Sequence, residues 1–290
     1  MVFTKRNFIA ATVAALLMGT AGIASAQEKL VISTANPPQH LQTLALKWFA
    51  DELEARSKGE LKSQIFDSGS LFNARDVGKA VARGDAGMAM VPSPYLSSIE
   101  ANINVLDLPM LSGLNEDQRN AMLDGELGQK LSAMLNEKMG VIIPGNWPLL
   151  GRVMYWSTKK PLTNFDQFKG MQMRIPGGAA ASVRMEAMGA IPVVMPGSDM
   201  PLALQQGTVD ATMGSIESIV QQKLTDVGVA YGFWDKGIIG YLIPIVSSKY
   251  WNSLSSDQQA LFTQVWNETV VKQRNRTVEQ DSEYRQTLLN

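Results

Sequence analysis

Short apolar segments alternate with amphipathic ones between Gly170 and Ser215, and this alternation predicts a repeated strand–helix order. Gly189 and Gly207 follow the two amphipathic segments, where a glycine is the usual residue after a helix end. Strands that alternate with helices favour a parallel sheet with right-handed crossovers. The expected strands are Met171–Ile175, Ile191–Met195 and Val209–Met213, and the expected helices are Ala179–Met188 and Pro201–Gln206.

Arg174 lies near the carboxyl end of the first of these strands. In open α/β sheets, ligands bind in the crevice beyond the carboxyl ends of the strands. A guanidinium is planar, always charged and able to pair with a carboxylate through two hydrogen bonds. Arg174 is therefore the first candidate for an anion-binding residue.

The first part of the chain shows the same order of elements. A helix after Asn36 carries apolar residues at helical spacing and ends at Gly59, and a second helix runs from Asn73 to about Ala82. Two similar α/β halves indicate two lobes with a cleft between them, where ligands tend to bind. The expected strands of this half are Lys29–Thr34, Leu61–Phe66 and Met88–Val91.

The remaining pattern connects the two halves. Helical spacing extends from about Asn115 to Lys138, and apolar strand candidates follow at Val141–Ile143 and Ile238–Val246. We expect residues 27–150 to form lobe 1, with part of 241–270 crossing back to it, and residues 151–240 to form lobe 2. Residues 249–290 are expected to contain a long helix, starting near Ser256, that spans both lobes.

The N-terminus has the pattern of a secretory signal peptide. Lys5 and Arg6 precede the apolar run Phe8–Met18, and Ala24-Ser25-Ala26 fits a cleavage site, so residues 1–26 are predicted to be removed. Loss of Lys5 and Arg6 leaves 24 basic residues against 27 acidic ones, a net charge of −3. That charge argues against nucleic acid or an anionic membrane surface as a partner.

The chain offers little material for catalysis. It has no cysteine and a single histidine, His40. Thiolate and histidine-rich metal chemistry are thereby excluded, and we expect no metal and no cofactor. A Ser-His-Asp triad would have to use His40, and no G-x-S-x-G motif is present.

Three segments carry a family resemblance: FKGMQMRIP, MGAIPVVMP and LALQQGTVD. They resemble the solute-binding proteins of TRAP transporters, the DctP-like periplasmic receptors, and the likeness extends over nearly all of the predicted mature chain. The resemblance implies an α/β, two-lobed periplasmic-binding-protein fold with the ligand cleft between the lobes and a long C-terminal helix. It also implies a bidentate salt bridge from Arg174 to a ligand carboxylate. Arg152 matches the place of a second arginine that often joins it.

The sequence departs from the family pattern at two positions near the third strand of lobe 2. Ala211 stands where a glycine is usual, and Gly214 stands where an asparagine often contacts the ligand. Without that amide, the ligand is expected to be a monocarboxylate with a sizeable apolar or aromatic body rather than a sugar acid. The resemblance also implies further elements beyond Asn290.

Other residues are candidates for the pocket from their positions or side chains. Tyr95 and Ser93 follow a lobe 1 strand, Gly214 marks the altered ligand contact, and His40 lies at a helix start near the expected cleft. Trp147, Trp234 and Phe72 are candidates to stack on a ligand, although aromatic side chains are also common core residues. Glu217 and Asp235 are candidates to accept a bond from the ligand, whereas Asp210 is expected to cap backbone amides.

The function predicted on these grounds is that of an extracytoplasmic receptor, monomeric and located in the periplasm. It would bind a small organic acid and deliver it to the membrane permease subunits of a TRAP transporter. One alternative is a ligand-sensing receptor that docks on a sensor kinase. Another is a periplasmic enzyme on the same scaffold, which would need His40 or a carboxylate as its general base.

Overall fold

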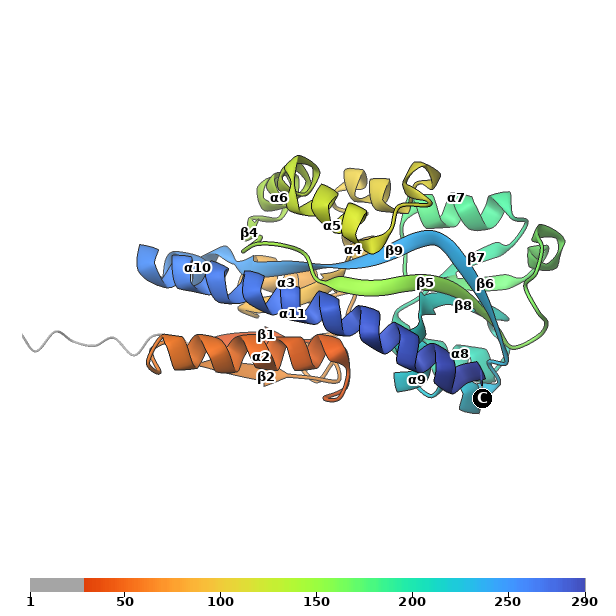
Figure 1. The fold of residues 1–290 in the computed structure, drawn as a ribbon, viewed down its shortest axis with the longest axis horizontal. Helices are drawn as coiled ribbons and strands as arrows, with labels where there is room; N and C mark the ends of the chain where they lie inside the picture. Colours follow the sequence, from red (N-terminus) through yellow and green to blue (C-terminus); the bar gives the residue numbers. More distant parts are fainter. Residues whose placement is uncertain (1–28, 290) are drawn as a thin grey trace, which may run out of the picture.

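The structure is a computed structural model that describes residues 29–289, apart from the side chains of residues 235 and 236. The predicted signal peptide and its cleavage site lie outside the described residues. Two α/β halves lie side by side along the long axis of the molecule (Figure 1). We call the half built on the strands within residues 30–92 lobe 1, and the half built on the strands within residues 172–215 lobe 2.

One mixed sheet runs through both lobes in the order β2-β1-β3-β9-β5-β8-β6-β7, with β4 paired to β9. The three outer strands at each end are parallel to one another, as the strand–helix alternation predicts. The strands are β1 (Leu30–Ser33), β2 (Ser63–Phe66), β3 (Met88–Pro92), β4 (Val141–Ile142), β5 (Leu149–Ser157), β6 (Gln172–Ile175), β7 (Ile191–Val194), β8 (Ala211–Ser215) and β9 (Tyr231–Ser247).

Strands β5 and β9 join the two lobes. The 17-residue β9 pairs with β3 and β4 in lobe 1 and with β5 along its other part, and each of these pairs is antiparallel. The β5–β9 register shifts next to Gly151, whose φ is +99° and whose partner is Gly240. The sheet is therefore continuous between the lobes but irregular where it crosses.

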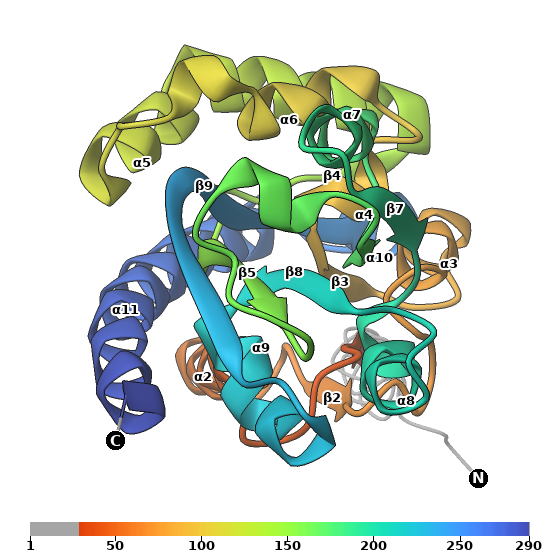
Figure 2. The ribbon, with the colours of Figure 1, turned by 90° about the vertical axis from the view of Figure 1, so that its right-hand side faces the viewer.

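Helices cover both faces of the sheet. Figure 2 shows α5, α6 and α7 on one side and α2, α8 and α9 on the other. The helices are α2 (Leu41–Arg56), α3 (Val77–Arg83), α4 (Ser93–Leu96), α5 (Glu116–Asp124), α6 (Glu126–Met139), α7 (Ala179–Ala187), α8 (Met200–Gln205), α9 (Ile216–Gln221), α10 (Ser248–Asn252) and α11 (Ser256–Leu289). Short 3₁₀ turns include η1 (Ala101–Asp107), η2 (Pro109–Leu111), η3 (Phe165–Phe168), η4 (Gly197–Asp199) and η5 (Leu224–Val227).

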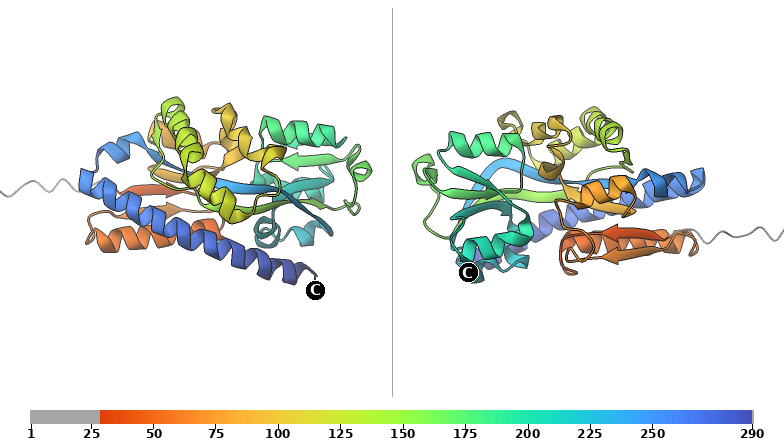
Figure 3. Two further views of the ribbon diagram at one scale, coloured as in Figure 1. Left: turned by 45° about the horizontal axis from the view of Figure 1, so that its top comes forward. Right: turned by 180° about the vertical axis from the view of Figure 1, so that it is seen from behind.

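The long helix α11 holds the two lobes together. Its 34 residues span about 50 Å at 1.5 Å per residue, and it runs past both lobes (Figure 3). Phe262 and Trp266 pack against Phe49 of α2 in the lobe 1 core, with ring centroids 4.8 and 5.3 Å from that of Phe49. Near the end of α11, Tyr284 packs on a lobe 2 cluster. The predicted α/β two-lobed fold with a long C-terminal helix is thus confirmed.

Several element boundaries differ from the sequence-based expectation. The helix expected from Asn115 to Lys138 is two helices, because Gly125 has an extended backbone that ends α5 and precedes α6. A Cβ on Gly128 would lie 1.7 Å from the carbonyl oxygen of Leu123, so this close approach requires glycine. The residues after Asn73 form a turn, and α3 begins only at Val77. Strand β9 begins seven residues before the expected Ile238, and α9 was not predicted.

Within the described residues, none of the helices is long and apolar enough to cross a membrane.

Candidate ligand-binding site

A cavity of about 270 Å³ lies between the lobes, and both lobes and the crossing strands contribute to its walls. Lobe 1 contributes the turn after β1 and the start of α4, and lobe 2 contributes the ends of β6 and β8 with the turn before α8. The residues that line it include Asn36, Gln42, Ser93, Tyr95, Asp107, Leu150, Val153, Arg174, Ser198, Met200, Met213, Gly214, Ser215, Ser218, Ile238 and Gly240.

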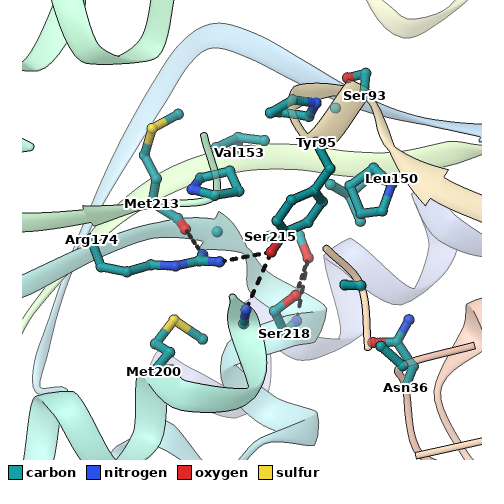
Figure 4. Close-up of a pocket in the computed structure, with 18 of the residues that line it drawn as sticks. Asn36, Ser93, Tyr95, Leu150, Val153, Arg174, Met200, Met213, Ser215 and Ser218 are labelled. Atoms are coloured by element: carbon teal, nitrogen blue, oxygen red, sulfur yellow. Dashed lines mark hydrogen bonds between the residues drawn. The ribbon is translucent and has the colours of Figure 1, made fainter. Parts of the chain in front are cut away.

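Arg174 on β6 brings a buried positive charge to this cavity. Its guanidinium donates through Nε and Nη2 to the carbonyl of Met195, at 3.1 and 2.9 Å. Its Nη1 donates to the carbonyl of Met213 at 3.2 Å (Figure 4). The residue is only 5% exposed, and burial lowers the pKa of its guanidinium. No carboxylate among the described residues lies within 4.0 Å of its nitrogens. A buried cation held only by neutral groups favours an anion as its partner.

Tyr95 connects Arg174 to the opposite lobe. It lies on α4 of lobe 1, and its hydroxyl oxygen accepts from Nη2 of Arg174 and from the backbone N–H of Gly197, each at 3.2 Å (Figure 4). Both donors belong to lobe 2. Because the phenol oxygen accepts two bonds, its own proton is free to be donated to an acceptor in the cavity.

Two further predicted residues line the cavity. Ser93 is buried at the start of α4, and Gly214 lies on β8 next to Met213. A Cβ on Gly214 would have Ser218 Cβ, 4.0 Å away, as its one neighbour within that distance. The missing side chain at position 214 therefore leaves open space in the site.

The three aromatic side chains predicted to stack on a ligand do not line the cavity. Trp147 is 1% exposed in the lobe 1 core, where its Nε1 donates to Ser132 Oγ at 3.2 Å. Phe72 packs on the edge of the same core. Trp234 lies against the guanidinium of Arg285, with a centroid distance of 4.5 Å. In each case packing or a cation–π contact already uses the aromatic surface.

Arg152 is not brought together with Arg174. Its Nη2 forms an ion pair with Glu116 Oε1 of α5 at 2.5 Å, and its guanidinium lies 5.8 Å from the Trp234 ring centroid. Its neighbours on β5, Leu150 and Val153, line the cavity, whereas Arg152 does not. In the structure Arg152 therefore forms an ion pair with Glu116 outside the cavity lining.

His40 also lies outside the cavity lining. It is 1% exposed and forms the N-cap of α2, where its Nδ1 accepts from the N–H of Gln42 at 3.3 Å. Burial lowers its pKa to about 4, so the ring is neutral at pH 7. Its nearest acidic group is Oε1 of Glu217, 3.4 Å away on α9, which accepts from the N–H of Leu41 at 2.7 Å. This pair is a polar contact between the lobes, away from the ligand cavity.

The other two acidic candidates have separate outcomes. Asp210 Oδ2 accepts from the backbone N–H of Gln172 at 3.0 Å, which is the structural role expected for it. The side chain of Asp235 lies outside the described part of the chain. Among the described residues, no group of three or more His, Cys, Asp or Glu side chains is arranged to hold a metal.

Sequence reasoning missed most of the cavity wall. Many of the missed residues are apolar or small and come from segments that meet only in the folded chain: Leu150, Val153, Met200, Met213, Ser215, Ser218 and Ile238. Polar residues of the wall that were also missed include Asn36, Gln42 and Asp107. Leu150 and Val153 flank the family-like Arg152, so their position beside a lobe crossing was an available signal.

The family model for bacterial extracellular solute-binding proteins, family 7 (DctP), matches residues 32–290. The chain belongs to this family. Family 7 proteins are periplasmic solute receptors, and the predicted DctP-like, TRAP-type relationship is thereby confirmed.

Individual relatives show which ligands other members of the fold bind. The C4-dicarboxylate-binding periplasmic protein DctP of Rhodobacter capsulatus is 27% identical over 213 residues, which cover 72% of this chain and 62% of that protein. A TRAP receptor from a Sulfitobacter species with bound β-D-galacturonate superposes with a TM-score of 0.85 at 19% identity, covering 90% of this chain and 86% of that one. A receptor from Sulfurospirillum deleyianum with bound succinate superposes with a TM-score of 0.84 at 24% identity, covering 90% of this chain and 83% of that one. The chain spans 62% to 68% of the length of five curated relatives.

Proposed function

We propose that this protein is the extracytoplasmic receptor of a TRAP transporter, which binds a small organic acid between its lobes and delivers it to the membrane permease. The observation that carries the proposal is the buried guanidinium of Arg174, which lines an inter-lobe cavity without a carboxylate partner. An organic acid supplies the missing negative charge.

The carboxylate would be held by Arg174 and by the hydroxyl proton of Tyr95. One Nη1 hydrogen of Arg174 is not used by the carbonyls and hydroxyl that surround the guanidinium. Because Tyr95 belongs to lobe 1 and Arg174 to lobe 2, a bound carboxylate favours approach of the lobes. Approach also excludes water, which strengthens the charge pairing.

The receptor reading accounts for the site better than the enzymatic alternative. His40, the one histidine, is a buried helix cap outside the cavity lining. The one acidic side chain in the lining is Asp107, which lies in η1. Export to the periplasm with cleavage after Ala26 and a monomeric state remain part of the proposal. Intact-mass measurement on the periplasmic fraction and light scattering test these two points.

Calorimetric titration of Arg174 variants tests the carboxylate clamp. Arg174→Ala leaves the ligand carboxylate unpaired in a buried site, which costs about 3–5 kcal/mol, or a factor of about 10² to 10^3.5 in affinity. Arg174→Lys recovers little, because an ammonium cannot form the two parallel bonds. Arg83→Ala, at an arginine exposed on lobe 1 and paired with Asp85, is the control and keeps wild-type affinity.

Thermal stability gives an independent measure of the same interaction. A ligand that binds only the folded state raises stability by about 2.7 kcal/mol at a hundredfold excess over Kd. We expect that rise with at least one organic acid and not with its neutral amide. Equal shifts with acid and amide, or unchanged affinity in Arg174→Ala, contradict the clamp. Uptake of the labelled acid by the reconstituted permease, dependent on this receptor, separates transport from a sensor role.

A further inference from the structure

The charged side chains that line the cavity provide a cationic partner for one carboxylate. Arg174 is the sole basic residue in the lining, and Asp107 is the sole acidic one. A dicarboxylate bound at Arg174 would bury its second negative charge without a cation. That charge would share a small cavity with the Asp107 side chain, which is itself 9% exposed. Burial of an unpaired charge is strongly unfavourable.

Several polar side chains of the cavity are already bonded to partners of their own. Nδ2 of Asn36 donates to Oε1 of Gln42 at 2.5 Å, and the hydroxyls of Ser215 and Ser218 lie 3.0 Å apart. The hydroxyl of Ser198 donates to its neighbour Asp199 at 2.9 Å. A ligand rich in hydroxyl groups would have to compete with these bonds, and each of its hydroxyls buried without a partner weakens binding.

The rest of the wall is apolar. Leu150 and Val153 of β5, Ile238 of β9 and the methionines 200 and 213 face the same space. Methionine side chains adapt to ligands of irregular shape. Beside them, the open space at Gly214 adds room for a ligand body where a larger residue would fill the site.

From these three observations we infer that the site selects an organic acid with a single carboxylate and an apolar body. The inference rests on the proposed carboxylate clamp at Arg174 and narrows the class of ligand. The class of ligand is the one expected from the sequence, but it is now inferred from other residues, because Trp147 and Trp234 do not line the cavity.

Six-carbon probes that differ only in polarity test this inference by calorimetry. Hexanoate carries one carboxylate on an apolar chain, adipate adds a second carboxylate, gluconate adds hydroxyls, and hexanamide removes the charge. Phenylacetate serves as a second monocarboxylate of different shape. We expect hexanoate or phenylacetate to bind at least about tenfold more tightly than adipate and gluconate, and hexanamide to bind weakly.

The outcomes separate the inference from the proposed function. Tighter binding of adipate or gluconate, lost in Arg174→Ala, overturns the apolar monocarboxylate class and leaves the receptor with its arginine clamp. Failure of every acid to bind at millimolar concentration overturns both. Equal binding of hexanoate and hexanamide also overturns both, because the clamp would then contribute nothing.

Substitution of Gly214 supplies a second test. Gly214→Asn places an amide in the open part of the cavity, so the ratio of hexanoate to gluconate affinity should fall by about tenfold or more. Gly214→Ala is the matched control, because it adds only a methyl group and should keep the preference for hexanoate. An unchanged ratio in Gly214→Asn would overturn the assignment of this space to the ligand body.

Discussion

The hydroxyl of Tyr95 provides a direct test of how the lobes act together on the ligand. Tyr95→Phe removes one oxygen and keeps the ring that packs on lobe 1. The lost oxygen accepts from the Arg174 guanidinium and the Gly197 N–H, which are both on lobe 2. The change therefore removes a polar link between the lobes and the proton proposed to reach the ligand.

The expected loss of affinity in Tyr95→Phe can be estimated from the two hydrogen bonds that the hydroxyl accepts. A hydrogen bond to a charged group contributes about 1.5–3 kcal/mol, and the bond from the neutral amide contributes about 0.5–1.5 kcal/mol. The amide of Gly197 lies at the turn before α8, and water replaces part of its lost bond when the lobes separate. We therefore expect affinity for the ligand acid to fall by about 10- to 150-fold, corresponding to the charged bond alone.

Calorimetric titration of Tyr95→Phe with the tightest-binding acid measures this loss. Tyr250→Phe is the matched control, because the Tyr250 hydroxyl is buried in the lobe 1 core and has no hydrogen-bond partner in the described structure. The control should bind as wild type does. Wild-type affinity in Tyr95→Phe, with a loss in Arg174→Ala, would show that the carboxylate site is complete within lobe 2 and would refute the inter-lobe reasoning.

Two further predictions concern residues outside the cavity. Burial raises the pKa of Glu217 to about 7, so its contribution to stability is complete below about pH 4.5 and is lost as pH rises through 7. Chemical denaturation should show that the free energy of unfolding of the wild type falls by about 1–3 kcal/mol relative to that of Glu217→Gln between pH 5 and 8. Both proteins contain His40, so its titration does not account for the difference, and Glu54→Gln at an exposed glutamate is the control. A difference that stays constant with pH contradicts the prediction. Trp147→Phe should lower the free energy of unfolding by about 1–3 kcal/mol and leave the affinity for the ligand acid unchanged. Weaker binding of the acid would show that Trp147 contributes to the ligand site.

Periodicity predicted the elements that bury a simple apolar face. In α2, Leu41, Ala45, Phe49 and Leu53 recur at helical spacing and are buried as expected. It failed where glycine geometry sets the path, as at Gly125 between α5 and α6. It also shortened β9, because Tyr231–Phe233 pair with β5 only beyond a break in the register, which a simple alternation of apolar residues does not reveal.

The site residues divide according to how local their signal is. The position of Arg174 at the cavity could be predicted, because the residue lies at the end of one strand and within one family-like motif. Arg152 sits in a family-like position, but Glu116, 36 residues earlier, determines which way it pairs. Trp147 and Trp234 have the right chemistry for stacking, yet burial and a neighbouring arginine use their faces. Partners that arrive from distant segments were beyond single-sequence reasoning.

The separation of roles across the lobes explains why one motif predicts the family and not the ligand. Lobe 2 supplies the fixed charge, Arg174, from a strand whose sequence resembles other receptors. Lobe 1 supplies Tyr95, and the crossing strands supply Leu150, Val153 and Ile238. An arginine on a rigid strand needs only a carboxylate, which many acids carry. Under the proposed function, discrimination among those acids therefore falls to the cavity walls, and at these positions the wall is apolar.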